Sequence, residues 1–311
     1  MFLRRGKQMK TLVNSFFKKR YPRRRSPMFK PSSGFTMIEL LVATVITTII
    51  IVPMLTFVVD ILNRDVREQA KTNSEQELQA AVDYIAQDMS QAFYIYDDTY
   101  LGDSSEVPPK PSYQDFLISS GLSENRPEPI LVFWKREFMG DSLPIPDPNC
   151  QNDCYDDTFV QSLVAYYLID DNNNTWCQPS GNPCPKRIAR FQIQDGVRDT
   201  KGNYLCTDDG GSFDCEDKFK RDMGYTPYNN ENPTAWTKES GETYTAPIVL
   251  VNYIKKFELN SVSNNKLAKI TIQGDALRRI KTSDTNCDSS IYCPRATAQV
   301  GSRSGFGTST N

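Results

Sequence analysis

A run of twenty residues without a charged side chain, at positions 40–59, restricts the fold of this chain more than any other feature of its 311 residues. At a rise of 1.5 Å per residue, a helix of this length spans the roughly 30 Å hydrocarbon core of a bilayer. The run is longer than the apolar region of an ordinary secretory signal, and no small-residue cleavage site follows it. We therefore predict a membrane-spanning helix, kinked at Pro53 because proline removes one backbone hydrogen bond.

The helix is expected to continue beyond the apolar run. Apolar residues recur at helical intervals through positions 60–93 among many charged residues, which is typical of an amphipathic helix. Between Phe35 and Phe93 there is no glycine and only one proline. We therefore predict one helix of about fifty to sixty residues. The alternative is two helices separated by a break near Asn63 or Asn73.

The segment before this helix is strongly basic. Residues 1–34 contain 11 of the 36 Lys and Arg residues and none of the 38 Asp and Glu residues. Removing this segment changes the formal net charge from -2 for the whole chain to -13 for residues 35–311. A basic segment ahead of an apolar helix stays on the cytoplasmic side of a membrane, which places the residues after the helix outside the cytoplasm. The acidic remainder argues against nucleic acid as a partner, because binding it requires clustered Lys and Arg.

The rest of the chain is predicted to form a β-rich head at 97–300 and a flexible tail at 301–311. The prolines Pro108, Pro109 and Pro111 end the helical region. Runs of β-branched and aromatic residues then predict strands at 130–138, 163–169, 188–193, 248–259 and 267–272. The expected fold class is α+β, in which a long N-terminal helix packs on a β-rich head whose loops are tied by disulfides.

All eight cysteines lie in the head, in the four close pairs Cys150/Cys154, Cys177/Cys184, Cys206/Cys215 and Cys287/Cys293. An even number of cysteines in loop-rich sequence predicts disulfides formed in an oxidising compartment. Pairing within each close pair is the first hypothesis, although eight cysteines allow about 105 arrangements. A structural metal and free thiols are the alternatives, but the pairs lack the two-residue spacing of zinc sites.

Enzyme activity is not expected. The chain has no histidine, which excludes the His-dependent serine and cysteine nucleophiles and removes the usual general base near neutral pH. We predict no cofactor and assign no metal site. Calcium is an alternative, because Asp170, Asn172 and Asn174 offer alternating oxygen ligands, but the Gly and Glu of an EF-hand loop are missing. A polar turn is the preferred interpretation.

The most specific motif lies where the basic segment meets the apolar run. It reads SSGFTMIELLVATVITTIIIVPML and contains Gly34, Phe35, Thr36, Ile38, Glu39 and Leu40. The motif resembles the N-terminus of type IV pilins and type II secretion pseudopilins. The resemblance implies that a prepilin peptidase cuts between Gly34 and Phe35, removes residues 1–34 and methylates the new N-terminus.

The same resemblance implies a role for Glu39 in filament assembly. A carboxylate inside a bilayer is costly and calls for a partner. In the family that partner is the amino group of the first mature residue, here Phe35 of the same or a neighbouring subunit, and such pairing offsets much of the cost of burial. The alternative is that Glu39 reaches the lipid headgroups.

The resemblance also implies partners and a location. The partners are the prepilin peptidase, other pilins or pseudopilins and an inner-membrane assembly platform. The chain is expected to be a single-pass protein of the cytoplasmic membrane with its head outside the cytoplasm. From there it enters a filament in the periplasm or at the cell surface.

A narrower resemblance is to the PilW-like and J-type large minor subunits, whose helix has the pattern LQxAxxYxxxDxxxA. The matching residues are Leu78, Gln79, Ala81, Tyr84, Asp88 and Ala92. Later phrases such as VAYYLID and KRIARFQIQDG are similar to cyanobacterial pseudopilins of hormogonium polysaccharide secretion and gliding motility. These similarities imply a minor subunit at the filament tip or in initiation, with extracellular polysaccharide as a further partner. The alternative is a surface binding protein or adhesin that uses the pilin signal only for export.

Overall fold

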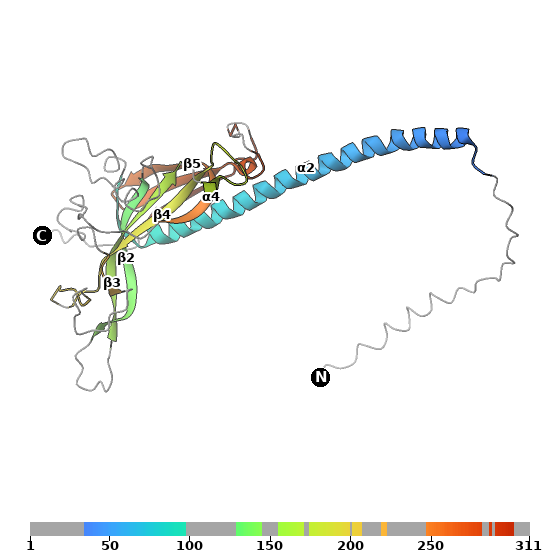
Figure 1. Cartoon of the computed structure of the whole chain (residues 1–311). Helices are drawn as coiled ribbons and strands as arrows, with labels where there is room; N and C mark the ends of the chain where they lie inside the picture. Colours follow the sequence, from blue (N-terminus) through green and yellow to red (C-terminus); the bar gives the residue numbers. More distant parts are fainter. Residues whose placement is uncertain are drawn as a thin grey trace, which may run out of the picture. The chain divides into compact units, whose positions relative to one another are not determined.

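The computed structural model describes residues 34–97, 129–144, 155–170, 174–199, 201–206, 219–222, 247–281, 286–287 and 290–301 (Figure 1). Its helices are α2 (Met37–Ser90), α4 (Asn174–Cys177) and the 3-10 helix η3 (Ala276–Arg279). Its strands are β1 (Ala92–Ile95), β2 (Pro129–Pro144), β3 (Tyr155–Ile169), β4 (Lys186–Gln194), β5 (Ile248–Ser263), β6 (Leu267–Gly274) and β7 (Arg295–Gly301).

Helix α2 is continuous over 54 residues and includes Pro53, which confirms the prediction of one long helix. A boundary between two compact units falls inside it, between Val59 and Asp60. In the first unit its most apolar 18-residue window has a mean hydropathy of 2.5, and no part of that window is buried. In the second unit one side of α2 is buried, at Ala70, Ser74, Leu78, Ala81, Val82, Ile85, Asp88 and Met89. This change follows the sequence, which is apolar all round before residue 60 and amphipathic after it.

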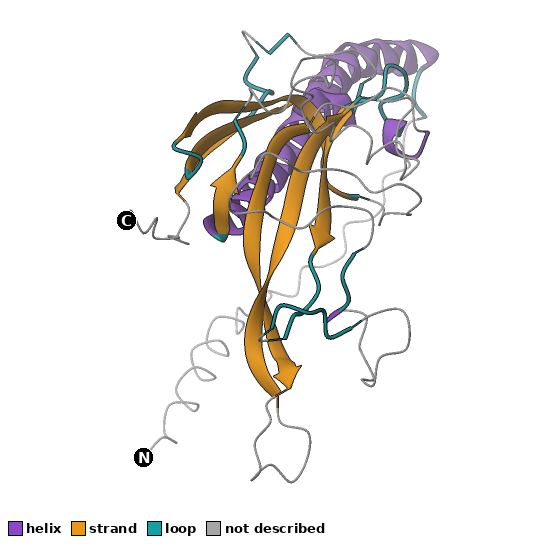
Figure 2. Cartoon of the chain, turned by 90° about the vertical axis from the view of Figure 1, so that its left-hand side faces the viewer, coloured by secondary structure: helices purple, strands orange, loops and turns teal. Residues whose placement is uncertain are grey.

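The strands form one seven-stranded sheet in chain order, and every neighbouring pair is antiparallel. Figure 2 shows the head part of α2 on one face of this sheet. The longest pairing joins β2 and β3, from Pro129↔Tyr167 to Pro144↔Tyr155. Beyond the other strands these two continue as a two-stranded arm (Figure 2). The α+β fold class is therefore confirmed.

Two cores lie on opposite faces of the sheet. The core under α2 includes Leu78 and Ile85 of the helix, at 2% and 0% exposure. On the other face Trp134, Tyr167 and Phe191 form a second core. Because successive residues of a strand point to opposite faces, the middle strands bury both sets of side chains. Apolar residues are therefore consecutive in parts of these strands, as in PILVFW of β2 and LVAYYLI of β3.

The five predicted strands lie within β2 to β6, but two strands were not predicted. The helix was expected to continue to Phe93, whereas it ends at Ser90 and Phe93 belongs to β1. Phe93 fits the helical period, so the local sequence does not distinguish a helix from a strand at this position. Tertiary contacts decide for a strand: Phe93 is buried in the second core, and β1 pairs with β2. Strand β7 was missed because its sequence RATAQVG has few β-branched or aromatic residues.

A buried ion network joins the end of α2 to the sheet. One carboxylate oxygen of Asp88 accepts a hydrogen bond from Lys135 Nζ of β2 at 2.9 Å. The other accepts from Tyr166 Oη of β3 at 2.7 Å and from Arg190 Nε of β4 at 2.8 Å. Glu137 lies beside Lys135 at 3.9 Å, so two acidic and two basic side chains balance each other.

The position of Asp88 explains why it needs these partners. It lies in the last turn of α2, where the backbone carbonyls already carry partial negative charge, and α2 has no basic residue in that turn. The sheet supplies the positive charges instead, through Lys135 and Arg190. Asp88 is therefore the side chain through which three strands fix the end of the helix.

Replacing Asp88 with Asn should lower the free energy of unfolding of the head by about 3–5 kcal/mol, because two buried cations lose their counter-charge. Chemical denaturation of the full chain in detergent micelles, followed by near-UV circular dichroism, measures the loss. Asp83→Asn is the matched control, since Asp83 is exposed on the same helix and bonds only Gln79 among the described side chains. Equal stability of the two variants would contradict this role of Asp88.

The same network predicts a dependence of stability on pH. Burial raises the pKa of Asp88, but the hydrogen bond from Arg190 and the charges of Lys135 and Arg190 outweigh it, and the net pKa lies below the usual value. A carboxylate whose pKa is lower in the folded state contributes stability that is fully present above its unfolded pKa of about 3.9 and is lost as the pH falls below it. Between pH 5 and pH 3 the native chain should therefore lose more stability than Asp88→Asn. Parallel curves for the two proteins would refute the assignment.

Candidate functional site

The first turn of α2 is closed by a reciprocal pair of side chains, Thr36 and Glu39. The backbone N–H of Thr36 donates to Glu39 Oε2 at 3.0 Å, and that of Glu39 donates to Thr36 Oγ1 at 3.3 Å. The Thr36 hydroxyl also donates to Glu39 Oε2 at 2.9 Å. This is a capping box, in which Thr at the N-cap and Glu three residues later satisfy backbone donors that the helix leaves open.

The carboxylate of Glu39 therefore already has partners within its own chain. Both of its hydrogen bonds end on Oε2, and no group in the described ranges bonds Oε1. The negative charge also lies at the N-terminus of a long helix, where the helix dipole favours it. The pattern T-x-x-E was visible in the sequence, but its capping role was not predicted from it.

Gly34 and Phe35, the residues on the two sides of the predicted cut, lie just before the helix. Among the described residues other than its chain neighbour, no heavy atom lies within 4 Å of the place where a Cβ of Gly34 would be. Local packing therefore does not require glycine at this position. Phe35 is 87% exposed, which leaves the bond between them accessible.

The apolar part of α2 satisfies its own polar groups. The hydroxyls of Thr44, Thr47, Thr48 and Thr56 donate to backbone carbonyls three or four residues earlier, at 2.7–3.1 Å. Such bonds are needed inside a bilayer, where no water is available. The apolar helix thus fits a single-pass membrane anchor, as the sequence predicts.

Two of the predicted cysteine pairs lie at disulfide distance. Cys177 and Cys184 have Cα atoms 4.5 Å apart, and Cys287 and Cys293 have Cα atoms 5.4 Å apart. Cys206 is also disulfide-bonded. The other predicted cysteines, Cys150, Cys154 and Cys215, lie outside the described residues.

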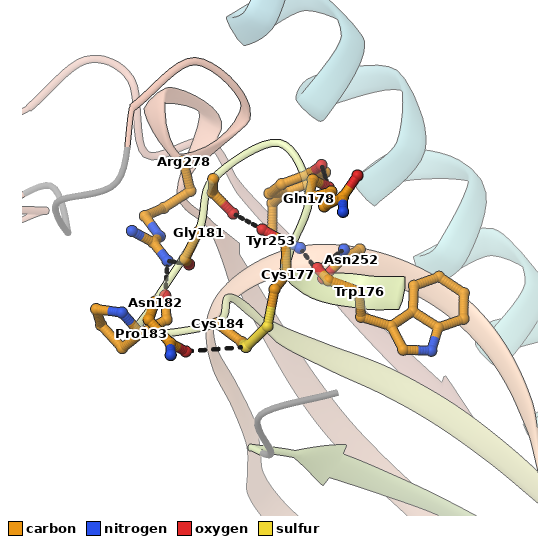
Figure 3. The surroundings of a disulfide bond; sticks show 11 residues. Trp176, Cys177, Gln178, Gly181, Asn182, Pro183, Cys184, Asn252, Tyr253 and Arg278 are labelled. Carbon is orange, nitrogen blue, oxygen red and sulfur yellow. Dashed lines mark hydrogen bonds between the residues drawn. A yellow bond between two sulfur atoms is a disulfide. The ribbon is translucent and has the colours of Figure 1, made fainter. Parts of the chain in front are cut away.

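We call residues 275–294 the strap; the structure describes 275–281, 286–287 and 290–294 of it, and the Cys287–Cys293 disulfide lies within it. On one side of the strap, Arg278 donates to the carbonyl oxygens of Gly181 and Pro183 in the loop closed by Cys177 and Cys184 (Figure 3). On its other side, Arg279 Nε donates to Ser74 Oγ of α2 at 3.0 Å, and the Tyr292 hydroxyl donates to Glu68 at 3.2 Å. The disulfide-tied loops therefore help to hold the head against α2.

The residues that the structure describes do not place Asp170 and Asn174 together with other calcium ligands. Asp170 pairs with Lys186 Nζ at 2.9 Å, and Asn174 begins α4. Asn172 lies outside the described residues. No group of three or more Cys, Asp or Glu side chains that could hold a metal ion occurs in the described ranges.

A surface cavity of about 280 Å³ lies beside the disulfide loop. Its charged lining consists of Asp170, Lys186, Lys255, Asp275 and Arg278. Lys186 is already paired with Asp170, and Arg278 is bonded to loop carbonyls. The charges of the cavity are thus largely engaged in holding the loop and the strap.

Comparison with known proteins agrees with the N-terminal site. The prokaryotic N-terminal methylation motif matches residues 29–55, a range that contains Gly34, Phe35, Thr36 and Glu39. No curated protein and no solved structure shows significant similarity to the chain. The motif supports a type IV pilin-like or pseudopilin subunit that a prepilin peptidase processes and that assembles with other pilins.

The capping box can be tested with two substitutions of Thr36. Thr36→Val removes the hydroxyl and should speed amide exchange at Glu39 roughly fivefold, because the cap no longer accepts its N–H. Thr36→Ser keeps the hydroxyl and is the control. Hydrogen exchange of the full chain in micelles, read by NMR, compares them, and identical rates at Glu39 in both variants would show that the cap does not form.

Proposed function

We propose that this chain is a minor pilin or pseudopilin, cut between Gly34 and Phe35, N-methylated and incorporated through α2 into a type IV pilus-like or secretion filament. The methylation motif on an apolar helix that has Glu39 in its first turn carries this proposal. The absence of a packing reason for glycine at position 34 fits selection by a processing enzyme. The protein has no turnover of its own in this scheme.

Assembly uses Glu39 in two successive ways. In the single subunit the capping box and the helix N-terminus satisfy Oε2 and reduce the cost of the carboxylate in lipid. Cleavage turns the backbone N–H of Phe35 into an ammonium group. That ammonium group, from the same or a neighbouring subunit, then pairs with Oε1 of Glu39, which the capping box does not use. The pairing fixes the stagger of neighbouring helices.

The size and shape of the head favour a subunit at the filament tip or one that initiates filament assembly. It carries a seven-stranded sheet with a long β2–β3 arm, and its size limits how many such subunits can stack along a shaft. Together with the resemblance to PilW-like and J-type subunits, this supports a minor subunit of a machine for motility or polysaccharide secretion. Its partners are then the prepilin peptidase, other pilins, the inner-membrane platform and extracellular polysaccharide.

Glu39→Leu tests assembly directly. The variant should be cleaved normally but should fall at least about tenfold in sheared filaments, because the helix loses the charge that pairs with Phe35. Asp60→Asn is the control, since Asp60 is an exposed acidic residue of the same helix. Quantitative immunoblots of membranes and filaments measure both.

Normal incorporation of Glu39→Leu would support the alternative in which Glu39 lies at the lipid headgroups. Deleting the whole protein from its host cell distinguishes an assembly subunit from an exported adhesin. Loss of filaments or of secretion supports an assembly subunit. Intact filaments with weaker attachment support an exported adhesin.

A further inference from the structure

The two edge strands of the sheet, β1 and β7, differ in the hydrogen bonding of their outer sides. At one edge, the turn between β5 and β6 closes the outer side of β1: Ile95 N donates to Asn265 O at 2.8 Å, and Asn265 Nδ2 donates to Ile95 O at 2.8 Å. At the other edge is β7, and no group in the described ranges hydrogen-bonds its outer side. A row of open backbone donors and acceptors is a template for another strand.

Strand β7 lacks the features that usually protect an edge. It pairs with β6 without a bulge, from Leu267↔Gly301 to Gln273↔Arg295. It contains no proline, and its only charged residue is the first, Arg295. Natural edge strands commonly use a bulge, a proline or an inward-pointing charge to prevent pairing. None of these is present between Ala296 and Gly301.

The side chains on the two faces of β7 indicate which side chains a strand paired with β7 would carry. On the α2 side, Ala296, Ala298 and Val300 pack against the main core but remain half-exposed, so this core is incomplete at the edge. On the other side, the hydroxyls of Thr297 and Thr271 lie 3.2 Å apart, and Thr271 also bonds Asn260 of β5. A strand added here would meet small apolar groups on one face. On the other face, beyond Arg295 at the start of β7, it would meet the uncharged hydroxyl and amide groups of Thr297 and Gln299.

We propose that the outer edge of β7 binds an extended strand of a second, different pilin-like subunit. This inference rests on the proposed function, because it requires assembly with other pilins. The incoming strand carries apolar residues on the face that continues the core under α2 and uncharged polar residues on the other. Main-chain hydrogen bonds supply affinity, and the alternating side chains supply specificity.

Symmetry argues against a second copy of this chain as the occupant. Antiparallel pairing of two β7 strands uses a two-fold axis perpendicular to the sheet, which reverses the head part of one α2 relative to the other. Parallel pairing of the same two edges puts the two helices on opposite faces of the joined sheet. Neither arrangement sets two α2 helices side by side in one direction, as packing in a filament requires. A different subunit that presents its own edge avoids both restrictions.

A photo-crosslinking amino acid at Thr297, in the full chain in its host cell, tests the proposal. The expected product joins Thr297 to an internal peptide of another protein that has an N-terminal methylation motif, as read by mass spectrometry. Adding Ala298→Lys should reduce this product at least tenfold, because the ammonium group reaches water in the free subunit but is buried once a strand is added. Gln299→Lys, on the solvent face of the next residue, should leave it unchanged.

Several results would overturn the proposal: crosslinks only to residues 302–311 of the same chain, crosslinks only to β7 of a second copy, or no product. Equal loss in both lysine variants would also count against it. Circular dichroism checks that each variant folds, and Ala296→Lys replaces Ala298→Lys if the latter does not. The N-terminus and the filament content of each sample are measured together. A processed, incorporated chain without the β7 product refutes only the edge proposal, whereas an unprocessed or absent chain refutes the proposed function.

Discussion

A single unbroken helix has to satisfy two different environments, and the other elements of the molecule follow from that requirement. Before residue 60, α2 exposes apolar side chains on every side and bonds its threonine hydroxyls to its own backbone. After that point it buries one stripe of residues on the sheet. The first turn of α2 imposes the second requirement, because the carboxylate of Glu39 next to an apolar helix needs hydrogen-bonding or charged partners. Thr36 is such a partner locally, and a charged N-terminus can be one in an assembly.

The head is organised to fix the far half of this helix. Asp88 fixes the last turn through Lys135, Tyr166 and Arg190, which come from three different strands. The strap contacts the helix at Ser74 and Glu68. One disulfide lies within the strap, and the other closes the loop whose carbonyls Arg278 bonds. Since disulfides form in oxidising compartments, these contacts agree with a head that folds outside the cytoplasm.

The helix, the fold class and five strands could be predicted because each rests on local patterns in the sequence. The apolar run, the helical period and the β-branched runs all act within a few residues. Elements that depend on distant partners could not be predicted in this way. Lys135 and Arg190 are buried only because Asp88 lies 47 and 102 residues away along the chain. Phe93 fits a helix until the pairing of β1 with β2 is known, and β7 is a strand because β6 lies beside it. The N-terminal motif could be recognised because Gly34, Phe35 and Glu39 lie within six consecutive positions, whereas the hydrogen bonds between Thr36 and Glu39 were not predicted.

We propose that the working protein begins at Phe35 and resides in a filament. Its formal charge of -2 then belongs to a precursor, and the mature subunit has a formal side-chain charge of -13. Intact mass and N-terminal sequencing of protein from sheared filaments test this claim most directly. We expect an N-methylated Phe35 at the terminus of the recovered chain. Recovery of a chain that still begins at Met1 would contradict it.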